Sequence, residues 1–187
     1  GLALGWTLMT AIAWLFRHRD RPSSARGFRS AQTVSAAAMA FGHGMQDAAK
    51  VSGVVVLALM ASGNRPSQGT DIPLWVVGLS GLAMSIGTYA GGWRIMRTLG
   101  SRIVPLTPPQ GFAAETAAAI TLAIATALRA PISTTYTITS GIIGVGTATN
   151  SRAVRWDVGR DILTAWLLTL PGAALAAAAS AWLFALA

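Results

Sequence analysis

The sequence contains no cysteine and very little charge. Only 11% of its 187 residues are Asp, Glu, Lys or Arg, and six of these are acidic. The lack of cysteine excludes disulfides and thiolate metal sites within this sequence. A soluble domain of this size carries charge on about a quarter of its residues, so the scarcity argues against a soluble fold. Instead, 53% of the residues are hydrophobic, and they gather in long runs that are typical of an integral membrane protein.

The charge that is present is mostly positive. Thirteen arginines and one lysine face six acids, which gives a net charge of +8. The arginines lie between apolar segments, without a basic helix and without aromatic residues interleaved for base stacking, so we expect no nucleic-acid partner. Their placement is typical of membrane proteins, in which basic residues are enriched on the cytoplasmic side.

Five regions are apolar enough to cross a bilayer, whose core of about 30 Å requires roughly 20 apolar residues per helix. They cover residues 1–16, 31–62, 73–92, 112–149 and 161–187. The fold class expected is therefore an all-α integral membrane protein. The first region is short, has no basic stretch before it and no cleavage site after it, so it resembles the end of a spanning helix and not a signal peptide. We therefore expect the chain to be a fragment of a longer protein.

Two of these regions are too long and too interrupted for one simple helix. Region 31–62 is interrupted by the glycines and polar residues around Gly42–Gly44, and region 112–149 by Pro131. Both patterns predict broken or re-entrant helices. Irregular backbone at membrane depth is stable only where protein or a wet cavity satisfies its N–H and C=O groups. Each predicted break is therefore a candidate cavity wall.

The distribution of arginine suggests a topology. The segment 17–30 contains five arginines and one acid, which predicts a cytoplasmic loop. Residues 131–149 either cross the membrane or dip into it and return. In the first case Arg152, Arg155 and Arg160 are cytoplasmic, and in the second they are external. The charge bias favours the crossing.

Ionisable residues within the apolar regions are the first candidates for function. Asp47 and Lys50 are three residues apart and share a helix face, close to His43 and Gln46. Charges at this depth are costly and usually pair or face a cavity, although a purely structural ion pair is the alternative. Glu115 either carries function or is a carboxylate favoured by the dipole at a helix start.

A run of hydroxyl side chains, "PISTTYTITSG", follows the predicted break at Pro131. With a helix starting at Pro131, the amides of Ser133, Thr134 and Thr135 would be free, and their hydroxyls would add donors suited to a tetrahedral oxyanion. The alternative is that these hydroxyls pack transmembrane helices together. The sequence shows no set of ligands around His43 that would complete a metal site, and no arrangement of nucleophile, base and orienting residue, so we expect neither a metal site nor an enzyme.

These stretches resemble the inorganic phosphate transporter (PiT) family. "FGHGMQDAAKVSGVVVLAL" resembles its HG-x-ND-x-x-[KN] signature, and "PISTTYTITSGIIGVG" resembles its P-[VI]-STTH motif. "GGWRIMRTLG" and "AWLLTLPGAAL" resemble its connecting and last helices. The resemblance covers nearly the whole chain and identifies it as the C-terminal half of a transporter built from two inverted repeats.

The resemblance implies a secondary transporter of inorganic phosphate that binds phosphate and coupling ions between the repeats. The implied partners are phosphate, free or as a metal complex, the lipid bilayer, the N-terminal half and a second copy in a homodimer. It also implies a multi-pass protein of the plasma membrane, which in a bacterium is the inner membrane. No cofactor beyond the coupling ion is expected.

The family's functional residues map onto this sequence as expectations. Asp47 matches the acid implied to bind the coupling ion, and Ser133, Thr134 and Thr135 match the hydroxyls implied to bind phosphate. Gln46, which we group with the phosphate-binding residues, stands where the family usually has asparagine.

Two further positions bear on coupling. Tyr136 stands where the family usually has histidine, which removes a group that titrates near neutrality. Lys50 places an ammonium beside Asp47, which favours protons over Na⁺ as coupling ion, with Na⁺ at Asp47 as the alternative. Glu115 is assigned to the coupling residues as well. Two other functions stay open, a sulfate permease of the same fold and a membrane scaffold or degenerate repeat without transport.

Overall fold

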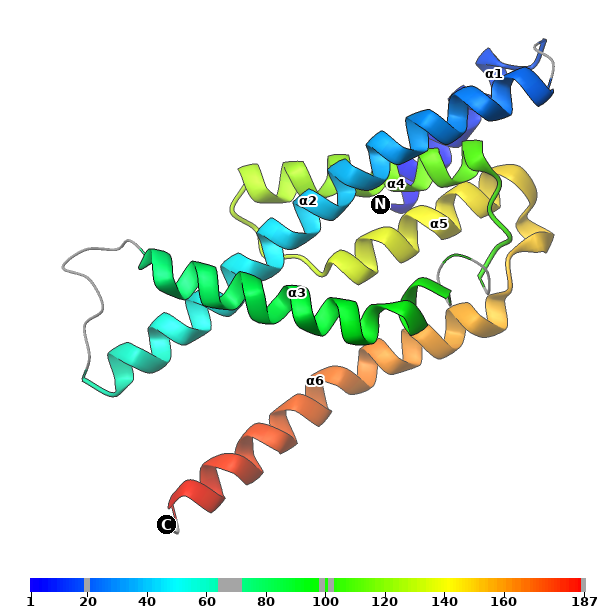
Figure 1. Ribbon diagram of the computed structural model, residues 1–187. Coiled ribbons are helices and arrows are strands. Elements are labelled where there is room, and N and C mark those ends of the chain that lie inside the picture. Colours follow the sequence, from blue (N-terminus) through cyan, green and yellow to red (C-terminus); the bar gives the residue numbers. More distant parts are fainter. Residues whose placement is uncertain (19–20, 64–71, 98–99, 101–102, 186–187) are drawn as a thin grey trace. The chain divides into compact units, whose positions relative to one another are not determined.

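The computed structural model describes residues 1–18, 21–63, 72–97, 100 and 103–185. Every regular element in these residues is helical (Figure 1), which confirms the expected all-α class. The elements are α1 (Leu2–Leu15), α2 (Arg21–Ala61), α3 (Leu74–Arg97), α4 (Pro108–Ala127), α5 (Thr134–Asn150), the short 3-10 helix η2 (Ser151–Ala153) and α6 (Trp156–Ala185). They form two compact units, Gly1–Val154 and Arg155–Ala187.

Three helices of the described residues are long and apolar enough to cross a membrane. They are Arg26–Ala61 within α2, Leu74–Trp93 within α3, and α6. Large apolar side chains on α3 and α6 are widely exposed, among them Leu74, Tyr89, Leu170 and Phe184. A monomeric soluble protein rarely exposes large apolar patches, whereas large apolar side chains are exposed along each of these two helices. Lipid or a protein partner would cover these surfaces.

Helix α2 corrects two of the sequence predictions. The predicted break around Gly42–Gly44 is absent, because α2 is one continuous helix of 41 residues. The predicted loop 17–30 is wrong for its larger part, because the helix already begins at Arg21. The physical reason is the distribution of proline. A glycine weakens a helix by about 1 kcal/mol relative to alanine but keeps its N–H, and no proline occurs between Pro22 and Pro66.

Helices α4 and α5 lie on either side of Pro131, where the sequence predicted a break. They contact each other and run in opposite directions (Figure 1). A capping interaction fixes the start of α4, where the Gln110 Oε1 accepts a hydrogen bond of 2.8 Å from the Thr107 amide. Helix α5 is uninterrupted from Thr134 to Asn150. The alternative in which residues 131–149 dip and return by themselves therefore does not fit.

Glycines bring the backbone of α1 close to that of α5. A Cβ atom on Gly5 would lie 2.5 Å from the carbonyl oxygen of Gly141, and one on Gly144 would collide with the carbonyl oxygen of Leu2. Small residues at helix contacts allow such close approach in membrane proteins. Helix α4 completes this core with buried alanines and Leu122, and α2 packs on its other side. The first unit thus holds α4 between α2 and the α1–α5 pair.

The second unit consists mainly of α6, which begins at Trp156, before the predicted start at residue 161. Pro171 lies inside this helix without ending it, and none of its residues is buried. Neighbouring groups can re-satisfy the backbone freed by a proline in a transmembrane helix.

Candidate functional site

Three ionisable side chains form a ladder along one face of α2. The Asp47 carboxylate lies 3.5 Å from the His43 Nδ1 through its Oδ2, and 3.1 Å from the Lys50 Nζ through its Oδ1. This spacing of four and three residues works only because α2 is continuous at this point. The Asp47 side chain is 21% exposed. A largely covered carboxylate is therefore held between an imidazole and an ammonium group.

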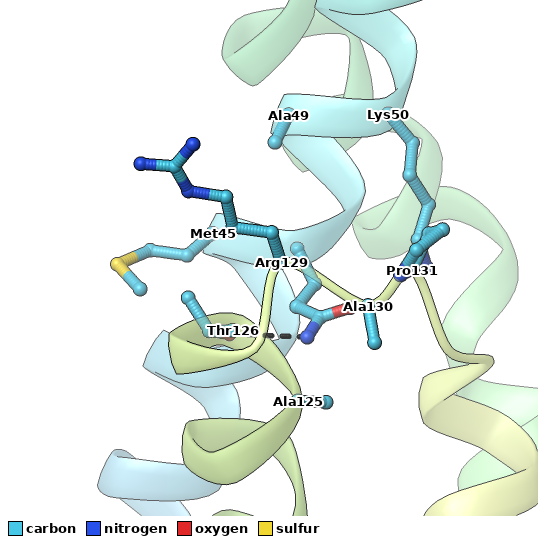
Figure 2. A pocket seen from close by; sticks show the side chains of 9 residues that line it. Met45, Ala49, Lys50, Ala125, Thr126, Arg129, Ala130 and Pro131 are labelled. Atoms are coloured by element: carbon cyan, nitrogen blue, oxygen red, sulfur yellow. Dashed lines mark hydrogen bonds between the residues drawn. The ribbon is translucent and has the colours of Figure 1, made fainter.

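Lys50 connects this ladder to the second motif. Its Nζ also donates a 2.6 Å hydrogen bond to the carbonyl oxygen of Ile132, which lies in the turn between α4 and α5. Figure 2 shows the Lys50 side chain running from α2 towards Pro131. The structure thus brings the signature stretch of residues 41–50 against the start of the hydroxyl-rich stretch.

The Gln46 side chain points towards α4 and not towards the start of α5. It is buried against α4, where its Nε2 donates to the Thr126 Oγ1 at 3.0 Å, drawn as a dashed line in Figure 2, and lies 3.4 Å from the carbonyl oxygen of Leu122. It lines an open pocket of about 510 Å³ between α2 and the α4–α5 turn. This pocket, which we call the Arg129 pocket, is formed by Met45, Gln46, Ala49, Lys50, Ala125, Thr126, Arg129, Ala130 and Pro131.

The hydroxyl residues of the second motif have different environments. Ser133 is the N-cap of α5, and its Oγ accepts a 3.4 Å hydrogen bond from the Tyr136 amide. The helix therefore begins after Ser133 and not at Pro131, so its unpaired first-turn amides are those of Thr134 and Thr135. These two threonines line a second pocket, whereas Ser133 lines neither that pocket nor the Arg129 pocket.

The second pocket has a volume of about 520 Å³ and is walled by α2, α3, α4 and α5. Its polar lining residues are His43, Thr88, Thr134 and Thr135, and we call it the His43 pocket. Sequence reasoning included neither His43 nor Thr88 among the site residues. The spacing of four residues between His43 and Asp47 was the available signal for the histidine.

Glu115 lies in a separate polar cluster. Its carboxylate accepts hydrogen bonds from the Ser35 Oγ at 2.7 Å and from the Gln32 Nε2 at 3.4 Å. Ser35 precedes Asp47 by 12 residues on the same helix, a separation of about 18 Å at 1.5 Å per residue. The structure therefore does not bring Glu115 to the Asp47 carboxylate.

The described part of the chain contains no group of three or more His, Asp or Glu side chains that could hold a metal ion. The Asp47 carboxylate is paired with the Lys50 ammonium. Taken together, the site offers a paired carboxylate, a helix start with free amides and hydroxyls, and two pockets. These groups can bind a small oxyanion and a proton or a monovalent cation.

Comparison with known proteins agrees with this chemistry. The model of the phosphate transporter family matches residues 3–177. The chain belongs to the phosphate transporter family. This confirms the membership inferred from the two motifs, and it places the described helices in a family of membrane transporters.

Curated members of the phosphate transporter family are similar along most of this chain. A probable low-affinity inorganic phosphate transporter of Rhizobium meliloti is 44% identical over 178 residues, which cover 95% of this chain and 53% of that protein. A protein of the same description from Mycobacterium tuberculosis is 40% identical, with 94% and 43% covered. Another from Bacillus subtilis is 34% identical, with 90% and 50% covered. The chain thus spans about half the length of the curated relatives it matches.

A solved structure supports the fold of this family member. It is described as the sodium-dependent phosphate transporter, and it superposes with a TM-score of 0.69 at 30% sequence identity. The match covers 86% of this chain and 41% of that chain. Over the matched part, the chain therefore shares the helical fold of that structure.

Proposed function

We propose that the protein containing this chain is a secondary transporter that carries inorganic phosphate across the membrane together with protons. The observation that carries the proposal is the contact of Lys50 with both the Asp47 carboxylate and the Ile132 carbonyl. It joins the acid of one motif to the helix start of the other. A coupling site and an anion site in direct contact are what cotransport requires, because binding at one must affect the other.

Coupling follows from the charge of the substrate. Moving one elementary charge across 100 mV is worth about 2.3 kcal/mol, so a divalent phosphate entering against an inside-negative potential costs about 4.6 kcal/mol per 100 mV. An uncoupled pore would release phosphate from the cell. Protons that enter with the anion, or entry as a neutral metal complex, would remove this cost.

The proton is favoured as coupling ion by the position of Lys50. Carboxylates and unwound backbone carbonyls are the groups that hold Na⁺ in transporters with broken helices, and here both already contact the Lys50 ammonium. A cation placed between them would meet the repulsion of that charge. Glu115 on α4 is a second acid of the first unit that could carry a proton. Because a relative of known structure is named as sodium-dependent, Na⁺ at Asp47 is the alternative.

For the anion, we propose that Thr134 and Thr135 donate hydrogen bonds at the start of α5, with Ser133 as its cap. Both threonines line the His43 pocket, and free helix amides favour anions. In the complete transporter an inverted N-terminal repeat would close the site, and two copies would form a homodimer in the plasma membrane. Gln46, bonded to Thr126, would shape the anion site from α2 without facing the threonines.

The α4–α5 hairpin would enter the membrane only to about half its depth. Lys50 lies 11 residues before Ala61, about 16 Å along the helix axis, and the residues between them are almost all apolar. A bilayer core is about 30 Å thick. The turn that contacts Lys50 would therefore lie near the middle of the bilayer. Both ends of the hairpin would face the cytoplasm, the side on which the arginine bias leads us to expect Arg152 and Arg155.

Uptake of labelled phosphate into proteoliposomes that contain the full-length protein tests the proposal. We expect accumulation driven by an inward proton gradient and not by an inward Na⁺ gradient. Sulfate in excess should leave the uptake nearly unchanged, because it carries no proton near neutral pH. Strong competition by sulfate would identify a sulfate permease, and a requirement for Na⁺ would contradict proton coupling.

A membrane scaffold without transport is the second candidate. The hydrogen bond between Gln46 and Thr126 favours it, because this polar contact joins α2 to α4 as an association device would. The variants Ser133→Ala and Ser133→Asn separate the two. Asparagine can cap a helix as serine does, so Ser133→Asn removes the hydroxyl and keeps the cap. Saturable phosphate uptake by the native protein would exclude the scaffold, whereas no native uptake combined with weaker dimerisation of both variants would favour it.

A further inference from the structure

Arg129 has a backbone conformation that is unusual for its side chain. Its φ of 54° lies in the left-handed region, just after the end of α4. The Arg129 amide donates to the Thr126 carbonyl at 3.0 Å, and the Ala130 amide donates to the Ala125 carbonyl at 2.8 Å. This pair of bonds ends a helix in the Schellman pattern, whose left-handed position usually holds glycine. An arginine is disfavoured there by its Cβ atom, which suggests that its side chain serves a function.

The guanidinium group of Arg129 carries a charge that its surroundings do not balance. Within the described residues no carboxylate lies within ion-pair distance of it, and no acid lines the Arg129 pocket. The other cation of the pocket, Lys50, is already matched by Asp47 at 3.1 Å. The pocket therefore has an excess of one positive charge, supplied by Arg129.

The Lys50 ammonium also has one N–H group left to donate to a ligand. A lysine ammonium carries three N–H groups, and two of them are used by Asp47 and Ile132. Figure 2 shows the Arg129 guanidinium on the side of Met45 and Ala49, while the Lys50 side chain runs towards Pro131. The two cationic groups thus bound the pocket on different sides.

We infer that the Arg129 pocket is an oxyanion-binding site, separate from the Thr134 and Thr135 hydroxyls, in which Arg129 attracts a phosphate group and Lys50 donates a hydrogen bond to it. This rests on the proposed function, for which the pocket captures inorganic phosphate before it reaches the threonines. Arginine suits this role because its planar donors match phosphate oxygens. The phosphate of a lipid headgroup has the same chemistry, so the experiment includes an arm for it.

The test compares variants in which charge and backbone strain are separated. Arg129→Gly removes the charge and relieves the left-handed conformation, whereas Arg129→Lys keeps the charge and the strain. Arg152→Gln is the matched control, because it removes an exposed arginine beyond the far end of α5. Phosphate uptake by the full-length protein is measured in vesicles of phosphatidylcholine, at low and high ionic strength and over a range of phosphate concentrations.

We expect Arg129→Gly to raise the KM for phosphate about tenfold, the effect of one partly screened charge near an anion, while Vmax and thermal stability are retained. The difference should shrink at high ionic strength. Arg129→Lys and Arg152→Gln should keep a KM close to that of the native protein. An unchanged KM in Arg129→Gly, or an equal rise in Arg129→Lys, would overturn the inference.

The second arm repeats the measurement in vesicles with added phosphatidylglycerol. If the native protein and Arg129→Gly differ only there, the site takes a lipid headgroup and the capture of inorganic phosphate is refuted. A failure of the proposed function itself looks different, because the native protein would then show no saturable phosphate uptake at all. Saturable native uptake that Arg129→Gly leaves unaffected would refute the pocket alone.

Discussion

Lys50 and Ile132, which are 82 residues apart in the sequence, are joined by a 2.6 Å hydrogen bond from the lysine ammonium to the backbone carbonyl. The same ammonium lies 3.1 Å from the Asp47 carboxylate. One side chain therefore couples the acid of α2 to the turn that precedes α5. A change in the charge at Asp47, by protonation or by a bound cation, would be felt directly at the start of α5.

Replacing Lys50 should change the coupling ion. In Lys50→Asn the Asp47 carboxylate, the Ile132 carbonyl and the new amide oxygen would form a set of oxygen ligands without a competing charge, which suits a hard cation. We expect phosphate uptake by this variant to become stimulated by Na⁺, measured in proteoliposomes with imposed Na⁺ or proton gradients. Lys50→Arg, which keeps a positive charge, should stay insensitive to Na⁺. Equal indifference to Na⁺ in both variants would refute the role assigned to Lys50.

The depth of the hairpin tip can be measured with a single cysteine. The chain contains no cysteine of its own, so Ala130→Cys labels the turn specifically within it. We expect a small membrane-impermeant thiol reagent to modify this cysteine slowly, and saturating phosphate to protect it, because Ala130 lines the Arg129 pocket and we propose that this turn lies within the membrane. A cysteine at Arg152 serves as the control and should react without protection. Fast modification of Ala130→Cys, unaffected by phosphate, would indicate that the tip lies at the membrane surface.

The contact of α1 with α5 depends on glycine. In Gly144→Ala the new methyl group would collide with the backbone of Leu2, and such overpacking typically costs about 1–3 kcal/mol. We expect a lower melting temperature of the full-length protein in detergent. Gly78→Ala is the matched control, since nothing lies within 4 Å of its added Cβ atom. An equal effect of both substitutions would show that glycine matters only through helix propensity.

Because Glu115 lies away from Asp47, replacing Glu115 should affect the pH dependence of phosphate uptake without affecting the KM for phosphate. Glu115→Gln keeps an oxygen that can accept the hydrogen bond from Ser35, so we expect the fold to be retained. The variant loses a site that could carry a proton. The pH dependence of phosphate uptake should therefore change while the KM for phosphate stays nearly constant. A large rise in KM without a change in the pH profile would assign Glu115 to the anion site instead.

Of the two helix breaks predicted from the sequence, only the one at a proline is present in the structure. Pro131 removes a backbone donor, and the helices indeed end and restart around it. The glycines of Gly42–Gly44 keep their N–H groups, and packing against α4 outweighs their low helix propensity. Glycine runs in apolar segments therefore predict a break poorly when no proline accompanies them.

Local contacts at the site were predictable and distant ones were not. The pairing of Asp47 with Lys50 follows from a spacing of three residues on a helix. The contacts Gln46–Thr126 and Glu115–Ser35 each join residues 80 positions apart, and they depend on how α2 packs against α4. Spacing alone therefore could not show that Gln46 faces α4, or that Glu115 lies away from Asp47.

Phosphate uptake by the Asp47→Asn variant of the full-length protein tests proton-coupled transport most directly. The measurement is the initial rate of labelled phosphate accumulation in proteoliposomes under an inward proton gradient, with membrane insertion verified in the same preparation. We expect the variant to insert normally and its gradient-driven uptake to be abolished, because asparagine can neither bind the proton nor pair with Lys50 as an ion. Accumulation at the native rate by a correctly inserted Asp47→Asn protein would contradict proton coupling through Asp47.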